Sequence, residues 1–129
     1  MVNIVCQRIY QKEVTEGYRI LVDRLWPRGI KKEEAQIDRW IKEVAPSNEL
    51  RKWFSHIPER YDTFAEKYRA ELDLNPAAKE MIAFCRNDNS GFRIILLYAA
   101  KDEERNNAIV LKEWLDKKIN EPNGGKEND

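Results

Sequence analysis

The stretch Gly17-Tyr18-Arg19-Ile20-Leu21-Val22-Asp23-Arg24-Leu25-Trp26-Pro27-Arg28-Gly29 runs from an apolar strand directly into a charged loop. Residues 20–22 are all β-prone, and an uninterrupted run of this kind is typical of a strand buried on both faces. Asp23, Arg24 and Arg28 follow where such a strand ends. Ligands of open α/β sheets bind outside the carboxyl ends of the strands. The stretch therefore predicts a central strand with a site at its exit.

The composition narrows the class of protein. The chain has 129 residues, and Lys plus Arg and Asp plus Glu each total 23, so the formal net charge is zero. A neutral chain gives no overall electrostatic reason to expect DNA, RNA or an anionic membrane as partner. A hydrophobic share of 42% arranged periodically excludes intrinsic disorder, and the lack of a long apolar run excludes a transmembrane helix. No signal-peptide core follows Met1, so we expect a cytoplasmic protein.

Cysteine and histidine usage predicts neither a metal nor a disulfide. Cys6 lies in a strand-like run and Cys85 on an apolar helical stripe, so both are interpreted as buried thiols. His56 is the only histidine, and two distant cysteines with one histidine do not have the spacing of a zinc site. The sequence predicts no cofactor.

Two further strands flank the central stretch in sequence. Residues 3–9 are predicted as a strand, because Ile4 and Val5 are apolar and Cys6 is small, and this strand ends at Arg8-Ile9-Tyr10. Residues 93–98 contain a second uninterrupted apolar run, which we expect beside residues 20–22. Residues 11–17 are fewer than a full parallel crossover requires. The first two strands are therefore either antiparallel or joined by an abbreviated crossover.

Helical periodicity and capping signals predict about five helices. Ile37, Trp40, Ile41 and Val44 follow i, i+3, i+4, i+7 spacing. The expected helices are 33–44, a short one from the Ser47 cap to about His56, 58–74 from Pro58, 75–85 from the Asn75 cap, and a last one capped by Asp102. The fold class is thus a small, mostly parallel α/β sheet of about three strands, with exits at Tyr10, Asp23 and Tyr98, in a single domain over residues 1–120. Residues 121–129 are expected to be a flexible polar tail.

Several motifs together resemble the YeaO-like family, a domain of unknown function. They are the 17–29 stretch, Arg8-Ile9-Tyr10, Glu49-Leu50-Arg51-Lys52-Trp53-Phe54, Tyr68 with Glu71-Leu72, and Leu96-Leu97-Tyr98-Ala99-Ala100-Lys101-Asp102. The resemblance covers nearly the whole chain before the tail and implies a small α/β fold, without an established activity. Many relatives carry a histidine near the position of Arg105 or Asn107, and this chain has none there. Some relatives are labelled tetrapyrrole methyltransferases, but no glycine-rich cofactor loop supports that activity here.

The candidate site is a cluster at the strand exits. Each exit carries a cation, and we expect Arg8, Arg24, Arg28 and Lys101 to converge with Asp23 on one cleft that holds a small anion. Asp23 would orient the guanidinium groups, and Asp23 and Arg24 are the catalytic candidates if a reaction occurs. His56, at a helix end, is a weaker catalytic candidate. The ligand-binding set is completed by Trp26, Tyr98, Asp102 and Asn106, with Asn107 as a further amide near the pocket.

Two other classes of function stay open. The loop from Arg24 to Lys32 combines cations with Trp26, as in single-strand nucleic-acid binders, although the zero net charge counts against it. Trp40, Trp53 and Trp114 could instead anchor a protein partner, but each lies on a helical stripe that a core would explain. A structural role for the Asp23 and arginine cluster, as an ion-pair network, is the remaining alternative.

Overall fold

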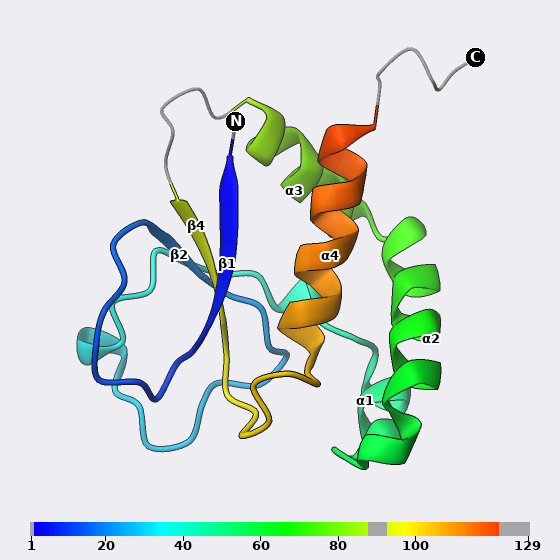
Figure 1. The fold of residues 1–129 in the computed structure, drawn as a ribbon. Helices are drawn as coiled ribbons and strands as arrows, with labels where there is room; N and C mark the ends of the chain where they lie inside the picture. Colours follow the sequence, from blue (N-terminus) through cyan, green and yellow to red (C-terminus); the bar gives the residue numbers. More distant parts are fainter. Residues whose placement is uncertain (1, 88–92, 122–129) are drawn as a thin grey trace.

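A single parallel sheet organises the protein. The computed structural model describes residues 2–87 and 93–121, and its sheet has the strand order β1-β4-β2-β3. The strands are β1 (Asn3–Arg8), β2 (Tyr18–Leu21), β3 (Arg39–Trp40) and β4 (Arg93–Tyr98). Figure 1 shows the sheet with the α-helices gathered on one side of it and irregular chain on the other. The α/β class and the single domain are confirmed, with four strands where three were expected.

The register answers the question that the short 11–17 segment left open. β4 pairs in parallel with β1, Asn3 lying opposite Arg93, and also in parallel with β2, Tyr18 lying opposite Ile94. β1 and β2 therefore run in the same direction but never pair, because β4 lies between them. The expected adjacency of residues 20–22 and 94–97 is confirmed.

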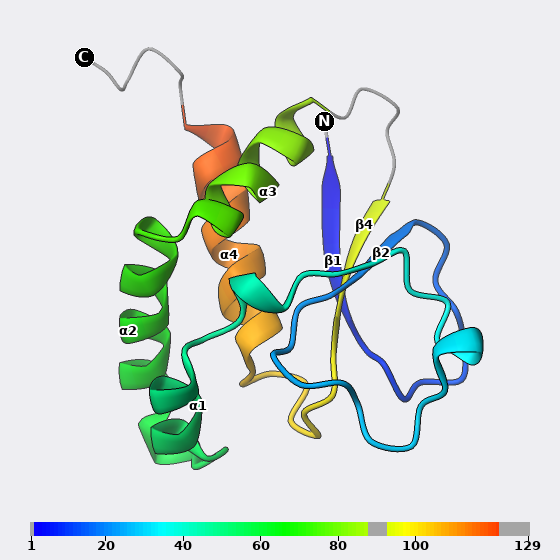
Figure 2. The same cartoon turned by 180° about the vertical axis from the view of Figure 1, so that it is seen from behind.

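One face of the sheet packs against helices. The described residues form four α-helices, α1 (Asn48–Phe54), α2 (Tyr61–Asp73), α3 (Pro76–Arg86) and α4 (Asn107–Asn120), and three short 3-10 turns, η1 (Lys32–Glu34), η2 (Lys42–Val44) and η3 (Pro58–Arg60). Figures 1 and 2 show α4 directly beside the sheet and α2 farther out. Ile20, Ile94 and Leu96 are buried here with Leu111 of α4. Alternation along the strands directs these side chains to the helix face.

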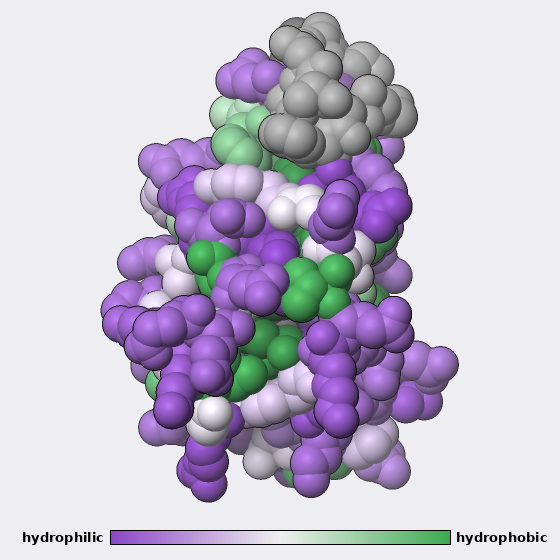
Figure 3. Space-filling view, turned by 90° about the vertical axis from the view of Figure 1, so that its left-hand side faces the viewer, coloured by the Kyte–Doolittle hydropathy of each residue, from purple (hydrophilic) through white to green (hydrophobic). Residues whose placement is uncertain are grey.

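The other face lies under loops. Leu21, Ile95 and Leu97 point to this side and pack against Trp26 and Ile37 from the irregular segments around β2 and β3. Figure 3 views this side of the molecule and shows apolar side chains at its centre, between polar loops. We call it the loop face, and the opposite side the helix face.

The expected helix over residues 33–44 is wrong. This segment instead contains η1, the two-residue strand β3 and η2. Its apolar residues serve two different cores, because Ile37 and Trp40 pack on the loop face whereas Ile41 and Val44 pack on the helix face. Residues that divide between two faces of a sheet cannot form one apolar stripe of a helix.

The other expected helices are present at nearly the expected places, with one changed cap. The Ser47 side chain accepts a hydrogen bond from the Leu50 N–H, and the Asn75 side chain accepts one from the Ala77 N–H, so both N-caps are confirmed. The last helix begins later than expected, because Asn106, and not Asp102, caps it by accepting from the Ile109 N–H.

Two sequence-based expectations concern membranes and the tail. No helix within residues 2–87 and 93–121 has the length and apolar character needed to cross a membrane. The expected polar tail lies outside the described residues, apart from Glu121.

Candidate functional site

Side chains link the three strand exits at the carboxyl edge of the sheet. Arg8, at the end of β1, donates from Nε to the carbonyl oxygens of Ala99 at 3.3 Å and Ala100 at 2.9 Å, just beyond β4. The Ala99 N–H in turn donates to Oδ2 of Asp23 at 2.9 Å, just beyond β2. The exits of β1, β4 and β2 are therefore joined in the order in which the strands lie in the sheet.

A second link joins the β1 exit to the loop after β2. The Arg8 guanidinium lies over the Tyr10 ring, 4.8 Å from its centroid. The Tyr10 hydroxyl donates to the Arg28 carbonyl oxygen at 2.7 Å. Arg28 thus contributes its main chain, while its side chain is exposed and makes no hydrogen bond or ion pair with the rest of the described chain.

Asp23 is held by neutral donors. Its Oδ2 accepts from the Ala99 N–H, and its Oδ1 accepts from Nδ2 of Asn107 at 3.1 Å, in the first turn of α4. Burial raises the pKa of the Asp23 carboxyl above its ordinary value of 3.8, and these two hydrogen bonds oppose that shift. No ion pair joins Asp23 to a described cation, so the expectation that Asp23 orients the guanidinium groups is wrong.

Arg24 is positioned by main-chain carbonyls. Its Nε donates to the Pro46 oxygen at 3.1 Å, and its Nη2 donates to the Ala45 oxygen at 3.2 Å. These bonds attach the loop after β2 to the chain entering α1, where Ser47 also hydrogen-bonds Glu71 of α2. Carbonyl oxygens fix the guanidinium without neutralising its charge.

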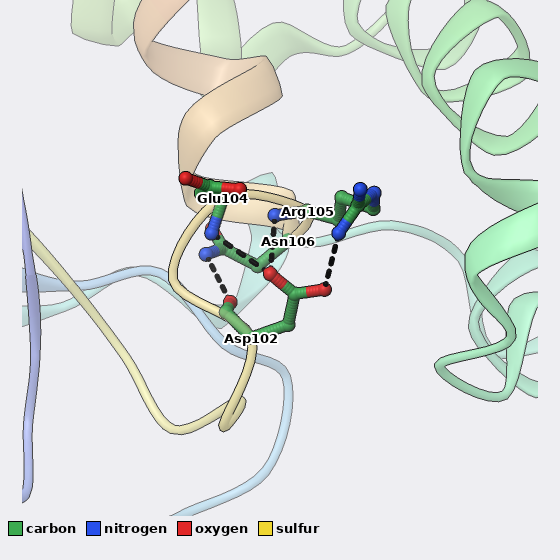
Figure 4. Close-up of polar contacts among 4 residues, drawn as sticks. All are labelled: Asp102, Glu104, Arg105 and Asn106. Atoms are coloured by element: carbon green, nitrogen blue, oxygen red, sulfur yellow. Dashed lines mark hydrogen bonds and ion pairs between the residues drawn. The ribbon is translucent and has the colours of Figure 1, made fainter.

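The turn before α4 is closed by its own side chains. Figure 4 shows Oδ1 of Asp102 accepting from the main-chain N–H groups of Glu104 and Arg105, while its Oδ2 forms an ion pair with the Arg105 side chain at 3.3 Å. Asn106 is buried and donates from Nδ2 to the Asp102 carbonyl oxygen at 2.9 Å. Burial raises the pKa of Tyr98 above its ordinary value, and the hydrogen bond with Asn106 opposes this shift. Asp102 and Asn106 therefore shape the edge of the site as turn and cap residues.

Lys101 and Trp26 differ in how many contacts their side chains make with the rest of the protein. Lys101 follows β4, is exposed, and its ammonium has no ion-pair partner among the described residues. Trp26 is partly buried, donates from Nε1 to the Ile30 carbonyl oxygen at 2.7 Å, and packs edge-to-face on Trp40. Its ring therefore belongs to the loop-face core.

His56 lies near the same edge through the end of α1. Ser55 and His56 both adopt left-handed backbone angles, with φ of 48° and 58°, which is uncommon for residues other than glycine. The His56 ring lies 5.7 Å from the Phe54 ring and is exposed to solvent. A charge on His56 lowers the pKa of Asp23, so the two side chains are within electrostatic reach.

The structure thus brings together part of the expected cluster. Arg8, Asp23 and Tyr98 meet through the exits of three strands, and Asn107, which sequence reasoning noted only as a neighbouring amide, contacts both the Asp23 carboxyl and the Val22 carbonyl oxygen. The sequence feature that indicates a role for Asn107 is the Asn106-Asn107 pair at the start of a helix. Arg28 follows β2 in the chain and Lys101 follows β4. Within the described residues, neither side chain forms a hydrogen bond or ion pair with Arg8, Asp23 or Tyr98.

Other chemistry is located elsewhere or is absent from the described residues. Within residues 2–87 and 93–121, no group of three or more His, Cys, Asp or Glu side chains could hold a metal ion. A small hollow lies away from Asp23, between β2, β3 and α3, where Ile41, Met81 and Phe84 line it. It has no group in common with the strand exits.

A family model and several curated proteins match this chain over most of its length. A family described as "Inactive DUF488-N3 subclade" matches residues 3–129. The chain is 46% identical over 114 residues to "Uncharacterized protein YeaO" of Escherichia coli, covering 88% of this chain and 96% of that protein. It is 38% identical over 109 residues to "Uncharacterized protein Rv3073c" of Mycobacterium tuberculosis and to "Uncharacterized protein Mb3100c" of Mycobacterium bovis, covering 84% of this chain and 89% of each relative. No solved structure matches the chain at a significant level.

Proposed function

Because the chain belongs to the YeaO-like family, in the branch described as the inactive DUF488-N3 subclade, we propose that it binds a small anionic molecule without transforming it. The binding site is the carboxyl edge of the sheet, between the exits of β1, β2 and β4. Arg8, Arg24 and Lys101 bind the anionic group, and Asp23 accepts a hydrogen bond from a donor elsewhere on the ligand.

The observation that carries this proposal is the state of the two arginines. Arg8 and Arg24 are both partly buried and both donate to main-chain carbonyl oxygens, and neither forms an ion pair with a described carboxylate. Each guanidinium has five N–H donors, of which these bonds use one in Arg8 and two in Arg24. A fixed, uncompensated guanidinium with unused donors is preorganised to bind phosphate, sulfate or carboxylate.

Asp23 determines which second group the ligand carries. Each of its oxygens accepts one hydrogen bond, so each keeps a lone pair for a ligand hydroxyl or N–H group. A simple anion alone would be repelled by an ionised Asp23. The preferred ligand therefore combines an anionic group with a hydrogen-bond donor.

The test compares two lysines with inorganic phosphate as the probe. Phosphate at ten times its Kd stabilises the native state by about 1.4 kcal/mol, which raises the Tm of a domain of this size by about 4 °C. We expect Lys101→Met to abolish this increase and to leave the Tm without phosphate unchanged, because the Lys101 side chain is exposed and forms no ion pair within residues 2–87 and 93–121. The matched control is Lys79→Met, which removes the same charge from an exposed position on α3.

Arg24→Ala is the less clean variant, since it also leaves the Ala45 and Pro46 oxygens without their donor. Chloride at equal ionic strength controls for general screening. The proposal fails if phosphate, which carries both anionic oxygens and a P–OH donor, does not raise the Tm, or if Lys79→Met removes as much of the effect as Lys101→Met. If phosphate raises the Tm as expected, mass spectrometry of small molecules that co-purify under native conditions identifies the natural ligand and shows whether it is unchanged.

Nucleic-acid binding through the Arg24 to Lys32 loop receives less support. Stacking on a base requires a free aromatic face, but Trp26 packs on Trp40 and lies 5.9 Å from the Lys32 ammonium. We expect no electrophoretic shift of single-stranded DNA or RNA at moderate salt.

A further inference from the structure

β1 is an edge strand whose outward backbone groups can be assigned from the ladder. The Ile9 N–H donates to the Tyr98 carbonyl oxygen of the β4 exit at 2.7 Å. In a parallel sheet, successive residues of a strand direct their backbone N–H and C=O groups alternately to one side of the strand and to the other. Asn3, Val5 and Gln7 therefore bond to β4, as Ile9 does. Ile4 and Cys6 therefore direct their N–H and C=O groups away from the sheet.

The same alternation is observed in the strands beyond β4. On the β4 side of β2, the Val22 N–H donates to the Leu97 carbonyl oxygen. On the β3 side, the Asp38 N–H donates to the Arg19 carbonyl oxygen. At the far end of β1, the Arg8 carbonyl oxygen is already taken by the Gln11 N–H at 3.1 Å. The free part of the edge is thus centred on Val5, between Ile4 and Cys6.

This edge lacks the features that usually protect edge strands. β1 contains no proline and no lysine, and its one charged side chain, Arg8, is turned to the carbonyl oxygens beyond β4. Figure 1 shows β1 nearest the viewer with no described helix or strand in front of it. The opposite edge, β3, is only two residues long and is followed directly by η2. The sheet therefore offers one regular edge for pairing.

We propose that a second copy of this chain pairs with β1, so that the protein is a two-fold dimer with a continuous eight-stranded sheet. The two β1 strands run antiparallel about an axis at Val5. Ile4 of each copy then lies opposite Cys6 of the other, and their outward N–H and C=O groups exchange four hydrogen bonds. This inference does not depend on the proposed ligand site.

The charge pattern of β1 suits pairing with a second copy. With the axis at Val5, the only charged residue of β1, Arg8, lies opposite Val2 of the other copy, so no like charges face each other. On the helix face, α4 contacts β1 and carries the ion pair of Lys112 with Asp116 at 2.5 Å. The Cys6 thiol donates to the Ala108 carbonyl oxygen of α4 at 3.4 Å, so α4 lies beside this edge. Because Lys112 is already paired with Asp116 within its own copy, this position brings no uncompensated charge to the edge.

The experiment uses substitutions at the axis itself. The native protein at about 100 μM, a concentration at which a contact of micromolar Kd is occupied, should have twice the chain mass by light scattering. Val5→Lys and Val5→Glu each place two like charges about 5 Å apart across the axis, so each variant alone should have the mass of one chain. An equimolar mixture of the two variants should return to the dimer mass, because opposite charges then meet. Leu74→Lys, at an exposed leucine after α2, is the matched control and should stay dimeric.

Every outcome decides the proposal. A native protein that has the mass of one chain overturns it, as does a dimer that survives both single Val5 variants or a mixture that stays monomeric. Where a Val5 variant does not fold, hydrogen exchange of the native protein replaces it. Slow exchange of the Ile4 and Cys6 amides supports pairing, and exchange as fast as that of an exposed edge overturns it.

Discussion

The helix face of the sheet is covered by α3 and α4, whereas the loop face is covered by residues 9–17 and 22–38, most of which are irregular. A helix satisfies its own N–H and C=O groups, so it can cover a sheet with apolar side chains alone. Irregular chain leaves backbone groups unpaired, and burying such a group without a partner costs free energy. The loop face must therefore supply more polar partners than a face covered by helices.

Buried and partly buried polar side chains supply these partners. Arg19 is buried in β2 and donates to the Gln36 carbonyl oxygen at 2.7 Å and to Oε1 of Gln7 at 3.0 Å. Trp26 and Trp40 donate from their indole N–H groups to the carbonyl oxygens of Ile30 and Asp23. One sheet is thus covered on one side mainly by packed helices and on the other by loops whose carbonyl oxygens are paired with side-chain donors.

The largest expected effect is on the loop face, at Arg19. Arg19→Met keeps much of the apolar volume but leaves the Gln7 and Gln36 oxygens without a donor. We expect the free energy of unfolding to fall by about 4 kcal/mol, because each buried acceptor left unpaired costs about 1 to 3 kcal/mol and the packing around the guanidinium is lost. Urea denaturation measures the change.

Arg39→Met, on the exposed neighbouring strand β3, is the control and should change stability by less than about 0.5 kcal/mol. Hydrogen exchange should accelerate in residues 9–17 and 31–38 of Arg19→Met before it accelerates in α4. Equal acceleration in both regions would contradict the division of the two faces.

The corresponding substitution on the helix face is Leu111→Ala. Leu111 is fully buried in the core between α4 and the sheet. We expect a loss of about 3 kcal/mol, from lost apolar burial and the cavity that remains. The exchange pattern separates this variant from Arg19→Met, since α4 and β4 should be affected together. A change confined to the loops would count against the comparison.

A smaller effect is expected from Trp40→Phe. The substitution keeps an aromatic ring on the loop face but removes the indole N–H that donates to the Asp23 carbonyl oxygen at 2.8 Å. The expected loss is about 1 kcal/mol, the usual net value of one hydrogen bond, with some further cost from the smaller ring. A thermal melt with a matched urea titration measures it, and an unchanged stability would show that this bond contributes nothing.

The smallest effect concerns pH and Asp23. Burial raises the pKa of this carboxyl in the folded protein, so between 3.8 and that raised value the native state binds more protons than the unfolded chain. The stability of the parent relative to Asp23→Asn should therefore be greatest below 3.8 and should decline as pH rises through the folded pKa. Urea denaturation of both proteins from pH 3 to pH 7 measures the difference in their free energies of unfolding. The contributions of the other carboxylates are the same in both proteins and cancel in this difference. A difference that grows with pH would reverse the sign of the effect.

Sequence patterns predicted the strands better than the chain between them. An uninterrupted apolar run such as residues 94–97 has one interpretation in a sheet of this kind, and so its position followed from the residues alone. Residues 37–44 had two interpretations, because i, i+3, i+4, i+7 spacing also arises when residues on either side of a short strand pack on opposite faces. Only the loop-face partners, such as Asp38, which accepts from the Arg19 N–H, distinguish them.

The site was predictable in position but not in its bonding. Strand exits identified Arg8, Asp23 and Arg24 as neighbours of one edge, since the carboxyl ends of parallel strands meet there. Sequence spacing could not show that Arg24 would donate to carbonyl oxygens 21 and 22 positions away, or that Asn107 would reach Asp23 from 84 positions away. These contacts depend on where α1 and α4 pack, which is a property of the whole fold.

The strand order also sets the sequence of events during synthesis. β1 and β2 are made early, yet both pair with β4, and the bond from Arg8 to Ala99 joins residues 91 positions apart. Until β4 leaves the ribosome, the apolar strands have no partner except the two residues of β3. Contacts between such distant positions slow folding, so we expect the nascent chain to depend on chaperones until its last quarter is complete. A chain stopped at Asn87 should retain helical signal from α1, α2 and α3 without a stable sheet.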